Sequence, residues 1–423
     1  MSSLRFLCDE EIEDVFGESS GDNDSNFGYD NTELVLNEDE DLDYLLSDDT
    51  DRSDSDENQS QNEEYEENNN EIADPLFISK DGRIWNSEPT SNQSGRIRSE
   101  NIITLPPGVT RYAKSRIDTP KDAFLLYFPK QIEKIIIENS NAFGQAKYGL
   151  QHIEIDSNLL YAYIGVLILA GVYRSNNETT DELFDEDNGR PIFRAIMPQK
   201  TFRYLNSIIR FDNTMSRRQQ SSSDKFEPIR DLFEKWNNLL PNFYNPYESV
   251  TVDEQLLGFR GKCPFRQYMP SKPAKYGLKF WMLVCSKTYY VWRIQPYLGK
   301  PIGALTSERN QGQRVVLDLV DGLKGHNVTI DNFFSSHELG QILFAKGLTM
   351  VGTMRKNKRS IPPKLLECRK LPLYTSTFAF TENTVLVSYV GRKNKCTILQ
   401  STFHDSNDVG CGPKKLPAII DYL

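Results

Sequence analysis

Residues 247–300 read YESVTVDEQLLGFRGKCPFRQYMPSKPAKYGLKFWMLVCSKTYYVWRIQPYLGK. Three stretches of this segment, ESVTVDEQLLGF, KYGLKFWMLVCS and TYYVWRIQPY, alternate apolar and polar residues and are rich in Val, Tyr and Trp, which predicts three β-strands. The following sequence predicts a helix over 311–323, a strand VTID that ends at Asp331, a helix over 335–346 and a strand LTMVGTM. Three strands followed by alternating helices and strands favour an α/β fold with a mixed sheet.

The sequence before residue 245 has a helical pattern. The segment TPKDAFLLYFPKQIEKIIIENSNAFG begins with Thr119 as a helix N-cap and a proline at the first helical position. Further helices are predicted over 158–173, 199–209 and 226–240. The apolar run 159–172 is shorter than the roughly 20 residues that a membrane span needs, so it predicts a buried core helix and no membrane partner.

Beyond the α/β segment, the stretches TFAFT, TVLVSYV and CTILQST return to an all-β pattern, which we interpret as a β insertion. Six cysteines are scattered without a CxxC pair or a signal peptide, so the sequence favours neither a disulfide framework nor a zinc site, and predicts a reduced intracellular compartment. No glycine-rich phosphate loop and no Ser or Cys nucleophile motif is present, so no small-molecule substrate is predicted.

Charge is distributed unevenly along the chain. The first 75 residues hold 27 Asp and Glu against two arginines, a net charge of -25, while the remainder holds 47 Lys and Arg against 33 acidic residues, a net charge of +14. The acidic tail lacks the apolar residues needed to offset chain entropy, which predicts disorder. A basic body favours a polyanion such as nucleic acid, although an ordinary solvated surface behind a solubilising tail remains the alternative.

Two aspartates are candidates for chemistry. Asp253 lies within the first predicted strand and Asp331 lies at the end of a later one. Carboxylates on neighbouring strands can converge, and their oxygens suit Mg²⁺ or Mn²⁺, which would polarise a phosphate and activate an attacking hydroxyl. The alternative is that each is a helix N-cap or a turn residue. The run RKNKR supplies Arg355, Lys356, Lys358 and Arg359, which form either a phosphate clamp or a solvated basic turn.

Residues 247–300 closely resemble the first catalytic block of piggyBac-family transposases. TIDNFFSSHELGQILFAKGLTMVGTMRKNKRSIP resembles the second block, LILAGVYRSNNETTDELFDEDNGRPIFRAIM the upstream helical region, and SKDGRIWNSEP the start of that region. The resemblance runs from about Asp74 to the end of the chain. It implies an RNase H-like DDE transposase core with a β insertion, preceded by a mainly helical dimerisation and DNA-binding domain and a disordered acidic tail.

The resemblance also implies where the domains begin and end. The implied divisions are a tail over 1–73, a helical domain over 74–245, the first part of the catalytic core over 246–370, a β insertion over 371–404 and a return segment over 405–423. The family cuts DNA with three acids and a divalent metal and joins the free 3′ hydroxyl at TTAA sites. Asp253 and Asp331 match its first two acids and metal ligands, and Arg355 and Lys358 match its DNA-binding basic positions. A nuclear homodimer on double-stranded DNA is therefore expected.

The C-terminal sequence departs from the family. Family members continue from the equivalent of Tyr422 to the third Asp and to a Cys and His zinc domain, which this sequence lacks, and Asp421 matches a variable position instead. We therefore expect an inactive, transposase-derived DNA-binding protein. The alternatives are a fragment of a longer active transposase and a domesticated scaffold that does not bind DNA. The residues that argue against the scaffold are Arg217, Arg218, Lys262, Arg266, Lys272, Lys275 and the basic run 355–359.

Overall fold

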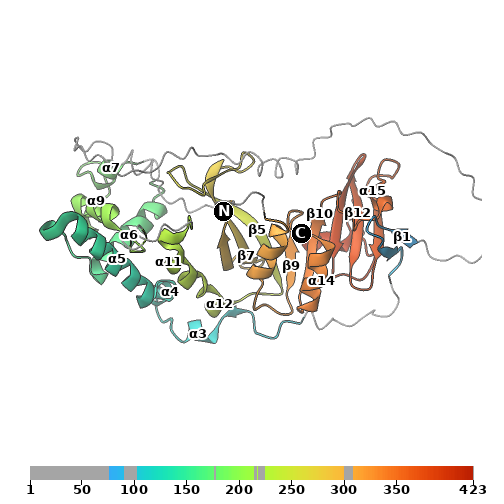
Figure 1. Ribbon diagram of the computed structural model, residues 1–423, viewed down its shortest axis with the longest axis horizontal. Coiled ribbons are helices and arrows are strands. Elements are labelled where there is room, and N and C mark those ends of the chain that lie inside the picture. The colour runs from blue at the N-terminus through green and yellow to red at the C-terminus, as the bar shows by residue number, and fades with distance from the viewer. Residues whose placement is uncertain are drawn as a thin grey trace, which may run out of the picture. The chain divides into compact units, whose positions relative to one another are not determined.

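The computed structural model describes residues 76–89, 102–175, 178–213, 217, 224–299 and 308–422 (Figure 1). The predicted acidic tail and Arg218 lie outside the described residues. Two compact units divide the chain. The described part of the first unit comprises residues 104–299 and 318–321, and that of the second comprises 76–103, 308–317 and 322–422, each with the gaps just given.

The first unit combines a helical module with a small antiparallel sheet. Its helices are α3 (Arg111–Lys114), α4 (Pro120–Tyr127), α5 (Lys130–Tyr148), η2 (Gly149–Gln151), α6 (Ser157–Val172), α7 (Thr180–Phe184), α8 (Pro191–Ile196), α9 (Gln199–Ile208), α11 (Glu227–Asn237) and α12 (Leu240–Phe243). Its strands are β3 (Gly108–Val109), β4 (Tyr244–Asn245), β5 (Ser249–Gly258), β6 (Gln267–Tyr268), β7 (Tyr276–Cys285) and β8 (Val291–Pro296).

Helices α5 to α9 share one apolar core, at whose centre Phe193, Leu205 and Ile208 are fully buried. The predicted N-cap is confirmed: Thr119 and Asp122 form a capping box at the start of α4. Helix α6 is a core helix on one face, but its opposite face leaves Ile168 and Val172 49 and 68% exposed. Among the described residues, no helix has the length and apolarity required to cross a membrane.

The sheet of the first unit confirms the three predicted strands. β5 pairs antiparallel with β7 from Val250↔Cys285 to Gly258↔Gly277, and β8 and β6 also pair with β7. Helix α11 covers the edge of β8, because the Asn237 side chain accepts from the Ile294 N–H and donates to the Ile294 carbonyl, both at 2.9 Å. The Asn237 side chain thereby joins the helical module to the backbone of β8.

The second unit is built on a longer sheet. Its elements are β1 (Leu76–Ile78), β2 (Ile84–Asn86), β9 (Asn327–Ile330), α14 (His337–Ala345), β10 (Thr349–Met354), α15 (Pro363–Leu366), β11 (Ser376–Phe380), β12 (Val385–Arg392), β13 (Lys395–Ser401) and η3 (Ala418–Tyr422). Helix α13 (Gln311–Leu319) begins in this unit, and its last two residues are grouped with the first.

The strand order of the second unit is β1-β2-β11-β12-β13-β10-β9. β9 and β10 are parallel, as expected for strands joined through a crossover helix, and α14 packs on β10 (Figure 1). The strands of the predicted β insertion continue this sheet, because β13 pairs antiparallel with β10. The first residues of the range assigned to the helical domain form β1 and β2 instead, and Trp85 of β2 is fully buried in the core of this unit.

Candidate active site and nucleic-acid interface

Asp331 lies at the carboxyl end of β9, directly after the buried Ile330, and is exposed. One of its carboxylate oxygens accepts a 2.8 Å hydrogen bond from the Thr353 hydroxyl of the neighbouring parallel strand β10. The Asp331 carbonyl accepts from the Phe334 and Ser335 N–H groups, which closes a tight turn between β9 and α14. The carboxyl ends of parallel strands are where α/β proteins commonly bind ligands, and Asp331 is presented there with a fixed orientation.

Two glycines allow this turn to pack closely. A Cβ on Gly352 of β10 would lie 2.6 Å from the Ile330 carbonyl oxygen and 2.6 Å from the Ser335 hydroxyl. A Cβ on Gly312 of α13 would lie 2.9 Å from the Phe333 carbonyl oxygen. Since these distances are well inside van der Waals contact, both positions require glycine to hold the turn in place.

The basic run follows β10 and lies beside the same turn. The Arg355 guanidinium donates to the Asn332 side chain at 3.4 Å and lies 5.9 Å from the centre of the Phe333 ring. Lys356 and Arg359 are exposed, and the Arg359 carbonyl accepts from the Asp81 N–H. Among the described residues, none of the four cations of this run forms an ion pair with a carboxylate. The structure therefore brings Asp331 and Arg355 to one edge, with further positive charge next to them.

Asp253 belongs to the first unit. It lies on the exposed face of β5, opposite Met282 of β7, while Val250 and Val252 point into the core. One Asp253 carboxylate oxygen accepts from the Glu254 N–H at 2.8 Å. The two candidate acids thus lie in different units, and each is exposed on or directly after a strand.

The other candidate cations of the first unit have varied surroundings. Lys272 forms a 3.0 Å ion pair with Glu254, and Arg217 pairs with Asp212 at 3.3 Å. Arg266 donates to the carbonyls of the preceding loop, and Lys262 and Lys275 are exposed. A cation that is already paired with a carboxylate presents less net positive charge to a DNA phosphate. Lys262 and Lys275 are therefore the stronger candidates of this set for binding phosphate.

The C-terminal segment lies along β9. The Thr329 hydroxyl donates to the Tyr422 carbonyl at 2.8 Å, and the Tyr422 ring packs edge-on against His404. Burial lowers the pKa of His404, opposed by the nearby carboxylates of Asp405, Asp421 and Asp408. Asp421 is exposed at this position, two residues beyond the buried Ile419.

The donor chemistry of the two aspartates suits a hard divalent cation, since both present carboxylate oxygens at exposed positions. In the part of the chain that the structure describes, no three His, Cys, Asp or Glu side chains gather closely enough to hold a metal ion.

Comparison with known proteins identifies relatives of this chain. The profile of the family described as Transposase IS4 matches residues 119–416. Human piggyBac transposable element-derived protein 3 is 24% identical over 244 residues, which are 56% of this chain and 40% of that protein. Human piggyBac transposable element-derived protein 2 is 24% identical over 249 residues, 57% of this chain and 41% of that protein. The chain therefore spans less than half the length of these relatives.

One solved structure is also similar to this chain. It is the cryo-EM structure of a piggyBac transposase synaptic complex with hairpin DNA, which is 33% identical and superposes with a TM-score of 0.69 over 75% of this chain and 67% of that chain. Together with the element order β5, β7, β8, α13, β9, α14, β10, this similarity defines a DDE-type transposase fold with an RNase H-like core. The chain belongs to the Transposase IS4 family, and its relatives there are piggyBac transposases and piggyBac-derived proteins.

The predicted fold class and family are thus confirmed, whereas three residues of the site were not predicted. Thr353 and Asn332 hold the Asp331 turn and Arg355 through side-chain hydrogen bonds. Gly352 permits the close approach of β9. A glycine inside the strand pattern LTMVGTM was a signal for such an approach. Nothing in the local sequence distinguishes Thr353 or Asn332 from ordinary polar residues.

Proposed function

We propose that this transposase-derived chain binds double-stranded DNA at the edge formed by Asp331 and residues 355–359. The observation that carries the proposal is the placement of an exposed carboxylate beside Arg355, the first of four cations in the run 355–359 that lack carboxylate partners within the described residues. Lys and Arg at such a surface gain affinity by releasing the counterions condensed on duplex DNA. The DNA complex of the structural relative supports the same partner.

The acids have a different role from the cations. We propose that Asp253 and Asp331 are two of the carboxylates of a DDE centre that takes Mg²⁺ or Mn²⁺, which would supply Lewis acidity at a scissile phosphate. Thr353 holds one Asp331 oxygen and so fixes the direction in which the carboxylate points. A polypeptide limited to these 423 residues contributes two acids of the family's triad, so we expect it to bind DNA without cutting or joining it at TTAA sites.

The DNA-binding test compares variants within the basic run. Binding of the full chain to a labelled duplex is measured by fluorescence anisotropy at several salt concentrations. Each lost phosphate contact reduces the slope of log K against log salt by about 0.9, so R355A and K356A should each lower the slope by about one contact. The matched control is K393A, because Lys393 is an exposed cation of the β12–β13 turn. Equal effects of all three changes, or salt-independent binding, would contradict the proposed interface and favour a scaffold without DNA binding.

The cleavage expectation has its own assay. The full chain is incubated with Mn²⁺ and a duplex that carries transposon-like ends and a TTAA target, and strand breaks are counted on a denaturing gel. No product above the background of a D331A variant is expected, because the third acid is not contributed. Breaks that depend on Asp331 would overturn the expected inactivity while leaving DNA binding intact.

We also propose a homodimer formed through the exposed face of α6. Ile168 and Val172 lie one turn apart on this face, and no described atom beyond the helix's own backbone and Gly165's chain neighbours lies within 4 Å of a Cβ built on Gly165. An apolar helix face of this kind fits a second copy of itself, because self-complementary patches form two-fold dimers. Light scattering should give twice the chain mass, and an I168D/V172D variant should give the chain mass. Unchanged mass in the variant would exclude α6 as the interface.

A protein that acts on chromosomal DNA must reach the nucleus, so we propose a nuclear location. A fluorescent fusion of the full chain should accumulate in the nucleus. Exclusion of the fusion from the nucleus would contradict this part of the proposal.

A further inference from the structure

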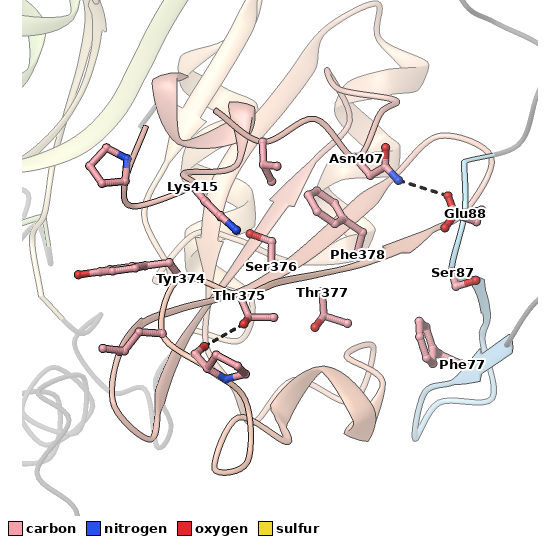
Figure 2. A pocket seen from close by; sticks show the side chains of 14 residues that line it. Phe77, Ser87, Glu88, Tyr374, Thr375, Ser376, Thr377, Phe378, Asn407 and Lys415 are labelled. Carbon is pink, nitrogen blue, oxygen red and sulfur yellow. Dashed lines mark hydrogen bonds between the residues drawn. The ribbon is translucent and has the colours of Figure 1, made fainter. Parts of the chain in front are cut away.

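A recess of about 670 Å³ opens on the second unit where β11 meets the C-terminal segment (Figure 2). Phe77 of β1 and Glu88 lie on one side of it, and Lys415 lies on the other, with its side chain directed toward Ser376. The Asn407 side chain donates to Glu88 at 3.2 Å and closes one end. The recess is lined by both apolar and hydrogen-bonding groups.

This recess follows the edge of β11. The Phe378 ring stacks on Phe380 at 6.1 Å and packs on one face of the sheet, whereas Ala379 belongs to the core on the other face. Because side chains alternate along a strand, Thr377 lies on the face of Ala379 and Ser376 on the face of Phe378. Thr377, Ser376 and Phe378 all line the recess, so it spans both faces and therefore runs along the strand edge.

Within the part of the chain that the structure describes, the backbone at this edge is open. β11 pairs with β12 over its whole length, whereas on the other side β2 contributes one pair, Phe380↔Asn86. The Thr381 N–H donates to the carbonyl of Thr384, directly before β12. Along an antiparallel strand, the N–H and carbonyl groups of successive residues point alternately to the two sides. The N–H and carbonyl groups of Phe378 and Ser376 therefore point away from β12. In the described structure the buried Ser376 hydroxyl also has no hydrogen-bond partner. An open edge of this kind is a template for an additional strand.

Positive charge flanks the recess. Lys414 and Lys415 are exposed at its C-terminal wall, and Arg369 and Lys370 are exposed just before the loop that forms its other end. An extended apolar segment with acidic flanks would complement this surface. The chain contains such a segment in residues 33–40, ELVLNEDE, which lie outside the described residues.

We propose that residues 33–36 of the same chain add to β11 as a further strand. Leu34 and Leu36 would face one side of the sheet and Val35 the other, while the acidic residues that follow would lie near the lysines. The connecting residues 37–75 end beside Phe77, which lines the recess. A random coil of that length would span roughly 30–40 Å, which is ample for docking in cis, and such a link would hold the segment at an effective concentration of about 1 mM. This inference does not depend on DNA binding.

Hydrogen exchange of the full 423-residue chain tests the proposal. If the segment docks with a Kd of about 0.1 mM at an effective concentration of about 1 mM, exchange of the Ser376 and Phe378 amides should slow about tenfold. The variant L34D/L36D should lose this protection. The matched control L45D/L46D alters another apolar stretch of the tail, YLL at residues 44–46, and should retain the protection. Protection that survives L34D/L36D, or that is lost equally in the control, would overturn the assignment.

A second pair of variants tests the edge itself. S376P removes the outward N–H that an added strand would use, whereas S376A keeps the N–H and removes the hydroxyl. Carbodiimide crosslinks between Lys414 or Lys415 and the carboxylates of residues 33–40 should form in S376A and be lost in S376P. Mixing ¹⁴N-labelled and ¹⁵N-labelled chains distinguishes crosslinks within one chain from crosslinks between two chains. Crosslinks within one chain support docking in cis, and crosslinks formed solely between chains would overturn it.

Discussion

Replacing Gly352 by alanine should loosen the turn that carries Asp331. The added methyl group would meet the Ile330 carbonyl oxygen and the Ser335 hydroxyl at 2.6 Å each. Both contacts must lengthen by about 0.9 Å to reach favourable van der Waals distance. The Ile330 oxygen lies in the β9–β10 ladder, where Gly352 is paired with Ile330, so relief requires the two strands to separate.

The expected cost follows from the rigidity of these neighbours. Overpacking a closely packed site costs about 1–3 kcal/mol. With a urea dependence of about 2 kcal/mol per M, the unfolding midpoint should fall by roughly 0.5–1.5 M. Because the strained atoms belong to the Asp331 turn, salt-dependent DNA binding should weaken as well.

Urea unfolding followed by tryptophan fluorescence measures the effect, since Trp85 is buried in the same unit. The matched control is G412A, because a Cβ on Gly412 meets no atom of the described structure within 4 Å. Its midpoint should stay within the range of ordinary surface changes, about 0.5 kcal/mol. If G352A unfolds at the same urea concentration as G412A, the close-approach argument for this turn is wrong.

Other expected outcomes concern both units. Burial raises the pKa of Glu133, but hydrogen bonds from Ser157, Tyr161 and Lys130 lower it overall; E133Q should therefore cost about 1.5–3 kcal/mol at neutral pH. That difference should shrink as pH falls below about 4.5 toward the lowered pKa, and urea unfolding should show a smaller difference at pH 3 than at pH 7. T353V should weaken calorimetric Mn²⁺ binding about 10 to 100-fold, because the Asp331 carboxylate loses its partner. W85A should cost about 3–5 kcal/mol in thermal unfolding, and a smaller loss would mean that β2 is peripheral to the core.

Much of the second unit could be read from local patterns. The short segments LTMVGTM and VTID predicted β10 and β9 to within two residues, because short strands that are almost continuously buried carry a compact apolar run. The same reasoning located Asp331 at a strand end. It could not assign the Thr353 hydrogen bond, because a threonine in a strand has the same local signature whether or not it faces a carboxylate.

The segment around Trp85 shows the opposite case. Two three-residue strands carry too little pattern to predict, and the sequence analysis assigned their residues to the helical domain over 74–245. Their location depends on antiparallel pairing with β11, almost 300 residues later in the chain. Such non-local pairing is decided by burial of Trp85 against distant side chains rather than by local propensity.

Periodicity and charge were enough to predict an α/β chain with an acidic tail, and the resemblance of its motifs to piggyBac-family transposases indicated the family, because these properties are written in neighbouring residues. Which side chains meet depends on close packing among elements that are distant in sequence. The pairing of β13 with β10, the contact of Gly352 with the Asp331 turn, and the open edge of β11 all result from that packing. Tertiary structure therefore decided the surroundings of the acids and cations, while the sequence alone decided their identity.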